Sequence, residues 1–306
     1  MRDTFVKTLL EIAKSDPNVH IITGDLGFGV LKPFWQELPN QITNVGIAEQ
    51  NMTGFATGLA LEGKIVFTYS IGNFPTLRTL EQIRNDAAYH NANVKIVCVG
   101  GGFVYGSLGM SHHATEDIAI MRALPNVKVF APGDLIEAEL VTKLIYKEDG
   151  VCYLRLGRGG EKKIHQYSPN LEIGKPLLIQ QGSKIALFST GAIMDEVLEA
   201  SRLIENGISI KPSIFTFPIV KPINKIIIQD ISKRYDLIVT VEEHNIFGGF
   251  GSSIAEIIST FKGEKPQMVH IGINDQYSSI VGSQSYLRAR YNIDALAIFN
   301  AVKDNI

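Results

Sequence analysis

The chain has 306 residues, of which 45% are hydrophobic and 20% charged, and its formal net charge is −2. This composition is typical of a soluble protein large enough for two domains, and it excludes a strong positive field for nucleic acid or an anionic membrane. The longest apolar runs, such as Ile96–Val99, have the length of a strand and predict no membrane span. The N-terminus does not resemble a signal peptide, and Cys98 and Cys152 lie singly in strand-like runs, so we expect a cytoplasmic protein without a disulfide.

The first half of the chain alternates short β-branched runs with helical patterns. Buried strands are expected at 19–24, 64–69, 94–99 and 127–131. Helices are expected between most of them and after the last, at 4–14, 50–62, 76–89 and 135–146. Alternation at this spacing predicts a mainly parallel sheet with helices on both faces. Ligands of such sheets bind at the carboxyl ends of the strands, and the polar residues considered below follow strands.

The pattern breaks after Arg158, where a polar segment with Pro169 and Pro176 predicts a linker. A second α/β pattern follows, with strands expected at 184–188, 208–217, 237–241 and 268–273. Its helices are expected at 192–204, 223–232, 251–261 and 293–302. We therefore predict an α/β protein with two doubly wound domains, at residues 1–165 and 183–306, joined by a linker at 166–182.

One carboxylate, Glu49, stands where a short β-like run (41–45) turns into the helix expected at 50–62. Small residues in that helix permit close packing, so Glu49 is expected to be buried. A buried glutamate needs a partner, or it takes up a proton. One interpretation is an acid that caps the start of a helix. The other is the carboxylate of a functional site.

Two further stretches follow predicted strands. The glycine-rich turn 24–29 contains Asp25, which either accepts backbone amides or faces a ligand; no Gly-Lys-Ser/Thr follows, so the turn is not a phosphate-binding P-loop. The stretch 69–82 contains two aromatic residues, Tyr69 and Phe74, and ends at Gln82. Its aromatic residues either fill the core or stack on a flat ligand.

A histidine pair, His112 and His113, follows a glycine-rich loop. Adjacent histidines cannot share one helix face, which excludes a metal pair at helical spacing. The pair belongs either to a solvated turn, with Thr115 capping the helix expected at 116–124, or to a site where imidazole exchanges protons near neutral pH. Arg2 and Arg155 are either exposed arginines or ligands of a phosphate or carboxylate.

Three stretches of the sequence together resemble the transketolase family. Residues 45–51 are similar to the family's Gly-Ile-Ala-Glu-Gln element, and 110–117 to its Thr-His-His motif. Residues 241–252 are similar to a Glu-Glu-His run followed by Gly-Gly-x-Gly-Ser in its C-terminal domain. The chain thus resembles the C-terminal subunit of a split, two-subunit transketolase, with a pyrimidine-binding domain followed by the transketolase C-terminal domain.

The resemblance implies a cofactor, thiamine diphosphate, and residues that bind it. Glu49 would hydrogen-bond the cofactor's pyrimidine ring, with Asp25 and Gln82 nearby. Either Tyr69 or Phe74 would stack on the pyrimidine.

It also implies transfer of a two-carbon ketol unit from a ketose to an aldehyde. His112, with His113, would handle hydroxyl and carbonyl protons of the sugar. Arg2 and Arg155 would bind its phosphate. Two departures concern sugar recognition, because Gly29 and Leu108 stand where many family members have a serine and an aspartate.

The family's Gly-Asp-Gly motif, which belongs to the diphosphate site and its Mg²⁺, does not occur in this sequence. We therefore expect no metal ligands in this chain and a separate diphosphate-binding subunit that carries them. The expected assembly is an α₂β₂ heterotetramer with active sites at subunit interfaces.

Three alternatives remain. The chain could be the β subunit of a 2-oxo-acid dehydrogenase, which also lacks the diphosphate site, or a carboligase similar to 1-deoxyxylulose-5-phosphate synthase. It could also be a non-catalytic scaffold subunit. The Glu-Glu-His run and the Ser-His-His loop favour a transketolase, and Glu49 together with the histidine loop favours an enzyme.

Overall fold

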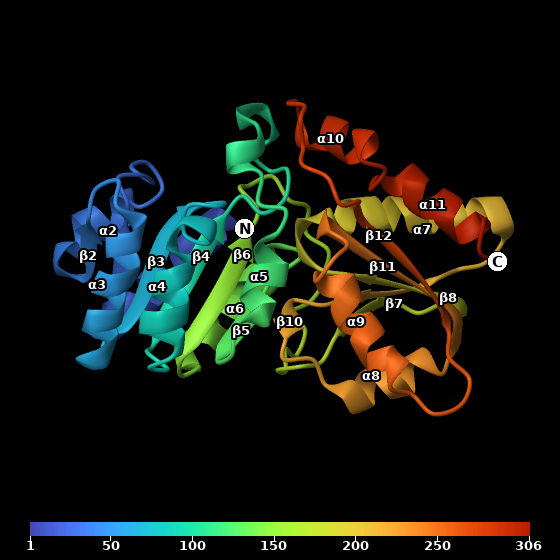
Figure 1. Cartoon of the computed structure of the whole chain (residues 1–306), viewed down its shortest axis with the longest axis horizontal. Helices are drawn as coiled ribbons and strands as arrows, with labels where there is room; N and C mark the ends of the chain where they lie inside the picture. The colour runs from blue at the N-terminus through green and yellow to red at the C-terminus, as the bar shows by residue number, and fades with distance from the viewer.

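The computed structural model describes residues 1–306, which form two α/β halves that lie side by side (Figure 1). The first half contains a seven-stranded sheet with the order β10-β5-β6-β4-β3-β1-β2, in which every strand but β10 is parallel to its neighbours. Its first six strands are β1 (Val19–Thr23), β2 (Ile42–Asn44), β3 (Ile65–Ile71), β4 (Val94–Val99), β5 (Val127–Phe130) and β6 (Val151–Leu156). Every residue of β4 and β6 is buried, which a parallel sheet covered on both faces requires.

Helices cover the two faces of this sheet. On one face, α1 and α6 pack their apolar residues into one core, and on the other α3 and α5 pack into a second. The helices are α1 (Arg2–Ser15), α2 (Lys32–Glu37), α3 (Glu49–Leu61), α4 (Leu80–Gln82), α5 (Asp117–Ala123) and α6 (Leu135–Lys147). The parallel sheet and its covering helices agree with the sequence-based expectation.

The prediction of a single helix at 76–89 is wrong in detail. The segment consists of a 3₁₀ turn (Leu77–Thr79), the short α4 and a π-helix (Ile83–Ala88). The wider π turns keep Ile83 and Ala87 buried against the sheet while the chain changes pitch. π turns are rare and are often found at functional sites.

The second half contains a five-stranded sheet with the order β12-β11-β8-β9-β7, in which only β7 is antiparallel. Helices α8 and α9 lie on one side of this sheet, and α7 and α11 on the other (Figure 1). The strands are β7 (Leu177–Gln180), β8 (Lys184–Ser189), β9 (Ser213–Thr216), β11 (Tyr235–Asn245) and β12 (Gln267–Ile273). The helices are α7 (Met194–Ile208), α8 (Lys225–Ser232), α9 (Phe250–Ser259), α10 (Gln284–Arg290) and α11 (Ala295–Lys303). None of the helices in either half is both long and apolar enough to cross a membrane.

The strand expected at 208–217 differs from the structure. It is shorter, as β9, and after Pro218 the chain enters the sheet of the first half as β10 (Ile219–Lys221), antiparallel to β5. Proline has no N–H for a ladder, and this one marks the point where the chain changes sheets. The expected linker at 166–182 contains β7, and α10 was not predicted.

Phe103 joins the two halves. It lies in the loop after β4, but its side chain is fully buried in the hydrophobic core of the second half. Its ring stacks on Tyr291 with 5.1 Å between centroids. A loop of the first half is therefore anchored in the core of the second.

We expect Phe103→Ala to lower the free energy of unfolding by about 3–5 kcal/mol, because a large buried ring is lost and a cavity remains. Phe28→Ala is the matched control, since the Phe28 ring is 67% exposed. Urea denaturation of the isolated chain measures both. Equal stability losses in the two variants would show that Phe103 does not anchor the loop.

Candidate active site

The candidate site residues that follow β1, β2 and β3 lie at one edge of the first sheet. The chain runs from β1 outward to β2 and then crosses back to β3 on the other side of β1. Ligands of open α/β sheets bind where the strand order reverses in this way. Asp25, Glu49 and Phe74 follow these three strands in turn.

Glu49 is the first residue of α3 and is only 3% exposed. Its Oε2 accepts a hydrogen bond from Nη1 of Arg78 at 2.9 Å. The start of a helix also favours a negative charge. Glu49 is thus a buried carboxylate with a cationic partner, which meets the need of a buried glutamate for one.

Arg78, which the sequence analysis did not single out, connects Glu49 to an aromatic pair. Its guanidinium lies over the Phe74 ring, 4.5 Å from the centroid. The His112 ring meets Phe74 edge-on, with 5.2 Å between centroids. Glu49, Arg78, Phe74 and His112 therefore form one continuous row, and no sequence motif indicated Arg78, which lies four residues after Phe74.

The loops after β1 and β2 are tied together by Asn44. Its side-chain oxygen accepts from the Asp25 N–H at 2.9 Å and from the Gly46 N–H at 3.0 Å. Its amide donates to Oδ1 of Asp25 at 3.2 Å. Asp25 has a left-handed backbone (φ 55°), which aspartate tolerates better than most residues, and it is exposed beside Glu49's loop.

The two aromatic candidates separate in the structure. Tyr69 is buried against Phe5, with nearly parallel rings 6.4 Å apart, and burial raises the pKa of its hydroxyl. Tyr69 is therefore a core residue, and Phe74 is the ring that lies in the row with Glu49. The sequence left Tyr69 and Phe74 as alternatives, because a tyrosine at the end of a strand can point to either face of the sheet.

Two of the buried polar atoms without a partner belong to residues close to Phe74 or Arg78 in the sequence. They are the side-chain oxygens of Asn73, next to Phe74, and of Gln82, at the end of α4. A buried acceptor that finds no donor in its own chain costs free energy and indicates a donor from elsewhere. A ligand rich in N–H groups would supply one.

The two histidines occupy different environments. His112 is half-buried and faces Phe74. His113 is buried, with Nε2 donating to the Gly106 carbonyl at 3.1 Å and Nδ1 paired with the Ser278 hydroxyl, and burial lowers its pKa. Both nitrogens of His113 are used in holding the loop, so the structure does not support the expected proton-transfer role. The expected Thr115 cap is also absent, because α5 begins after Glu116 without a side-chain cap.

Arg155 requires a correction. It is 5% exposed, and its Nε donates to Asp117 at 2.8 Å while Nη2 donates to the carbonyls of Ala114 and Glu243. Burial disfavours the charge, but Asp117 raises the pKa of Arg155 above its ordinary value. A guanidinium so enclosed holds the two halves together and cannot reach a substrate phosphate.

Arg158, three residues later, is exposed. Its guanidinium lies 5.5 Å from the centroid of the Tyr105 ring. Burial raises the pKa of Tyr105, and the positive charges of Arg158 and Arg2 partly oppose this rise. Arg158 was not singled out in the sequence, and Arg2, which was, is partly exposed.

Models of two protein domains match the chain. The transketolase pyrimidine binding domain matches residues 1–160, and the transketolase C-terminal domain matches residues 174–298. The chain belongs to the transketolase family. The resemblance seen in the sequence and the α/β fold expected from it are therefore confirmed.

Relatives of this transketolase-family chain span nearly its whole length. A protein of Methanocaldococcus jannaschii named "Putative transketolase C-terminal section" is 37% identical over 100% of this chain and 96% of its own. An apulose-4-phosphate transketolase subunit of Phocaeicola vulgatus is 33% identical over 96% of this chain and 93% of its own. The solved structure of a split-gene transketolase, described as an inactive beta4 tetramer, has 30% identity and a TM-score of 0.88, covering 99% of this chain and 96% of its own.

Longer family members match as well. The 1-deoxy-D-xylulose-5-phosphate synthase of Caldanaerobacter subterraneus subsp. tengcongensis is 32% identical over 98% of this chain, which corresponds to 48% of that enzyme. The chain therefore corresponds to about half of that longer enzyme and to almost the whole length of the shorter relatives.

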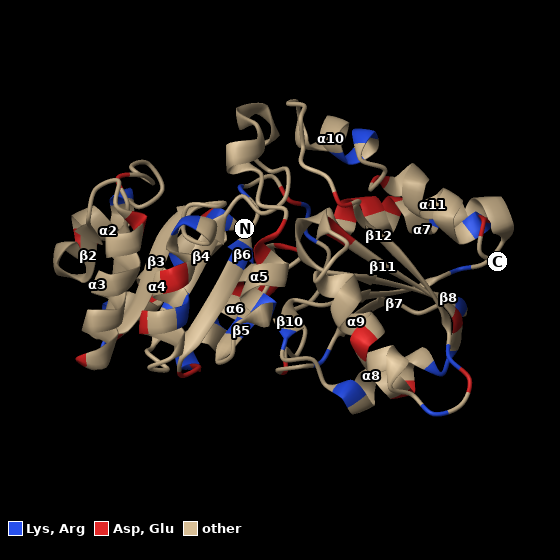
Figure 2. Cartoon of the chain, viewed as in Figure 1, with Lys and Arg blue, Asp and Glu red and all other residues tan.

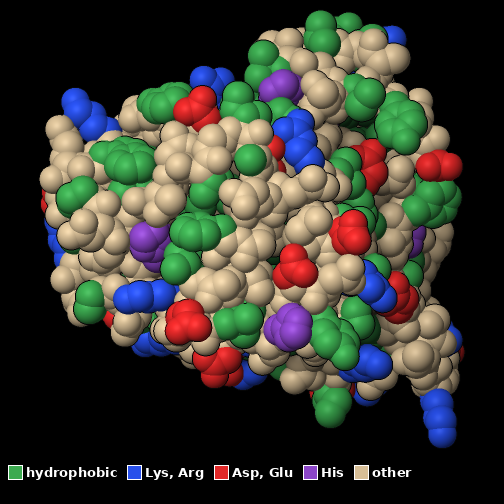
Figure 3. All heavy atoms as spheres, turned by 60° about the vertical axis from the view of Figure 1, so that its left-hand side comes forward, with side chains coloured by type: hydrophobic (Ala, Val, Ile, Leu, Met, Phe, Trp, Pro, Cys, Tyr) green, Lys and Arg blue, Asp and Glu red, His purple; other side chains and the backbone are tan.

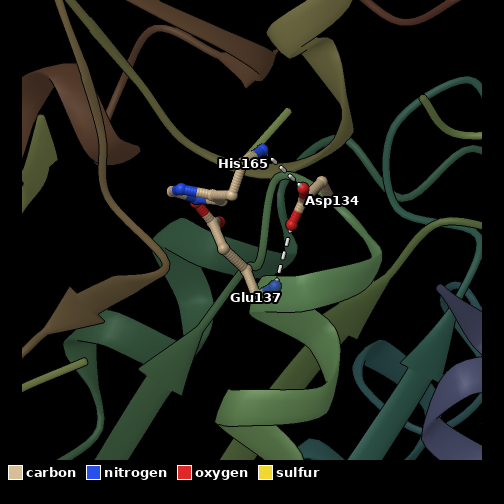
Figure 4. Close-up of side chains that lie close together, drawn as sticks. All are labelled: Asp134, Glu137 and His165. Atoms are coloured by element: carbon tan, nitrogen blue, oxygen red, sulfur yellow. Dashed lines mark hydrogen bonds and ion pairs between the residues drawn. The ribbon is translucent and has the colours of Figure 1, made fainter. Parts of the chain in front are cut away.

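A buried cluster of possible metal ligands lies elsewhere, at the start of α6 (Figure 4). Asp134 caps the helix by accepting from the Glu137 N–H at 2.8 Å, and its other oxygen accepts from the N–H groups of Ile164 and His165. Glu137 accepts from Nε2 of His165 at 2.7 Å and from the Gly133 N–H at 2.6 Å. The carboxylate oxygens are hydrogen-bonded within the chain, so the cluster fastens residues 164–165 to α6 without an ion.

His165 should make stability depend on pH. Burial lowers its pKa, but the bond to Glu137 outweighs burial and raises the pKa above the ordinary value of 6.5. The stabilisation is therefore complete below about pH 6.5 and is lost as pH rises through the raised pKa. We expect the free-energy difference between wild type and His165→Gln to be largest near pH 6 and to shrink towards pH 9, as measured by urea denaturation. Glu137→Gln should abolish this dependence, and a difference that grows with pH would contradict the assignment.

Proposed function

We propose that this chain is the C-terminal subunit of a thiamine diphosphate-dependent transketolase, which transfers a two-carbon ketol unit from a ketose to an aldehyde. The observation that carries the proposal is the buried Glu49 carboxylate at the start of α3, in one row with the Phe74 ring. The chain's family membership and its split-subunit relatives support it. When bound, thiamine diphosphate supplies an electron sink that stabilises a carbanion during C–C cleavage.

The residues present fit the aminopyrimidine part of this cofactor. Glu49 would accept a hydrogen bond from a protonated ring nitrogen, and Phe74 would stack on the ring. The unpaired oxygens of Asn73 and Gln82 offer acceptors for amino hydrogens. Asp25 stands exposed on the neighbouring loop. Arg78 would have to share or release Glu49, since it now donates to the same carboxylate.

His112 and the exposed arginines would serve the substrate. The His112 ring borders Phe74 and is only half-buried, so it can donate a proton to, or accept one from, a sugar hydroxyl. Arg158 and Arg2 would bind an anionic group of the sugar, since a guanidinium suits phosphate.

A partner subunit would complete the site. Apolar side chains are exposed in the loops around it, with Phe28 after β1 exposed at 67% and Ile47 before α3 at 77%. The face in Figure 3 presents apolar side chains among charged ones, and Lys, Arg, Asp and Glu are interspersed over both halves (Figure 2). A related split-gene transketolase is described as inactive in its beta4 form, which supports a need for the diphosphate-binding subunit. We propose an α₂β₂ assembly in which that subunit supplies the Mg²⁺ ligands.

A carboligase of the 1-deoxyxylulose-5-phosphate synthase type is the second candidate, because such enzymes match almost the entire chain. It would release carbon dioxide from pyruvate, whereas a transketolase would not. An assay of both reactions with the reconstituted pair distinguishes them.

We expect Glu49→Gln to reduce turnover of the reconstituted pair by at least about 100-fold, because the cofactor loses its ionised hydrogen-bond acceptor. Titration calorimetry with thiamine diphosphate and Mg²⁺ should detect binding to the pair but not to this chain alone. Glu62→Gln, at the exposed end of the same helix, is the control. Turnover of Glu49→Gln near the wild-type rate would exclude the proposal.

We expect Arg158→Ala to raise KM for a phosphorylated ketose about tenfold or more, with a smaller effect on an unphosphorylated one, because a charge-assisted bond is lost. Steady-state kinetics with the two substrates measure the difference. Arg84→Ala removes an exposed arginine on the π-helix and serves as the control. If the variant raised KM by the same factor for both substrates, Arg158 would not be a phosphate ligand.

A further inference from the structure

The loop that carries His112 belongs to the first half, but most of its fixed points lie in the second. It leaves β4 at Gly100 and reaches α5 at Asp117. Phe103 is buried in the second half's core. The placement of His112 therefore depends on residues far away in the sequence.

Glu243 lies near the end of β11, and its side-chain carboxylate accepts a hydrogen bond from the backbone of this loop. Its Oε1 accepts from the Phe103 N–H at 2.5 Å, and its Oε2 accepts from Nε of Arg288 at 2.6 Å. Gln284 donates to both oxygens. The contact leaves no space, because a Cβ at Gly102 would lie 2.6 Å from Cγ and Oε1 of Glu243. A left-handed glycine (φ +65°) is thus required where the loop passes the carboxylate.

Further contacts from the second half follow along the loop. The Gly282 N–H donates to the Gly106 carbonyl at 3.2 Å. The Ser278 hydroxyl pairs with His113, and the Asn245 N–H donates to the Thr115 carbonyl at 2.8 Å. The loop is therefore held on both sides of His112.

The first half holds the loop through Asn73. Its amide donates to the carbonyls of Ser111 and His113, at 3.4 and 2.9 Å. His112 lies between these two carbonyls, and its ring faces Phe74. The residues on either side of His112 are held by Asn73 and by the second half. The His112 imidazole itself faces Phe74.

We propose that Glu243 is a positioning residue of the active site, which fixes His112 opposite Phe74 through the Phe103 N–H and the anchored loop. The inference rests on the proposed function only for the role of His112. On this proposal the second half positions a residue of the active site. It contributes no residue to the row of Glu49, Arg78, Phe74 and His112.

The neighbouring Glu242 provides a matched control. It is as buried as Glu243, and it also accepts backbone N–H groups, those of Phe250 and Gly251, both at 2.7 Å. These bonds lie entirely within the second half, at the start of α9. Glu242→Gln and Glu243→Gln are therefore the same chemical change, and only the second reaches the His112 loop.

Hydrogen exchange of the isolated chain tests the physical claim. In Glu243→Gln, amides of residues 100–116 should exchange at least about tenfold faster than in wild type, because the local opening of the loop becomes easier. In Glu242→Gln, the faster exchange should appear around α9 and not in 100–116. Equal exchange of 100–116 in wild type and Glu243→Gln, or the same increase in both variants, would overturn the proposal. If Glu243→Gln does not fold, Gln284→Ala, which removes two of the four bonds to Glu243, should give a smaller change in the same segment.

Kinetics of the reconstituted pair test the positioning role. Glu243→Gln should keep the Kd for thiamine diphosphate within about threefold of wild type while kcat/KM falls at least about tenfold, since the defect concerns the substrate and not the cofactor. A parallel loss of cofactor affinity and activity would indicate a general structural defect and overturn the proposal, as would an unchanged kcat/KM. An inactive wild-type pair would instead refute the proposed function, and the exchange result would still decide whether Glu243 fixes the loop.

Discussion

Two buried ion pairs at the junction of the halves hold the loop that carries His112. Arg155 pairs with Asp117 inside the first half, and Arg288 pairs with Glu243 inside the second. Removing one partner of a buried pair typically costs about 3–5 kcal/mol, because the remaining charge is left uncompensated. Arg155 also donates to the Glu243 carbonyl, so the two pairs fix the halves relative to each other. The loop that carries His112 runs between them.

The sequence predicted what depends on local pattern. The parallel strands follow from buried β-branched runs, and a buried Glu49 with a partner follows from a carboxylate set among small residues at a strand-to-helix turn. What it missed depends on contacts between distant residues. Nothing local indicates that Arg155 is enclosed by Asp117 and that Arg158 is exposed, or that the chain changes sheets after Pro218. The identity of Glu49's partner, Arg78, also required the structure.

Adjacent residues of one type serve different purposes here because their surroundings differ. His113 is buried with both nitrogens bonded and has a lowered pKa, whereas its neighbour His112 presents its ring to the site edge. Glu242 holds the start of α9, and Glu243 holds the loop of the other half. The two glutamates lie in strand β11, where alternation along an extended backbone places neighbours on opposite sides, so this pair can join two structural units. A sequence motif made of such pairs can therefore indicate a contact between two structural units as well as a catalytic site.

On the proposed function, the two halves divide the work of one active site and leave a third part to another subunit. The first half contributes Glu49 and Phe74 at the switch point of its sheet, and the second fixes the loop with His112. Neither half covers the loops after β1 and β2, where Asp25, Phe28 and Ile47 are exposed. A buried carboxylate acts most strongly on a bound group when water is excluded from around it. On the proposed function, the partner subunit would exclude water at this open edge, and the site would work only when the two subunits associate.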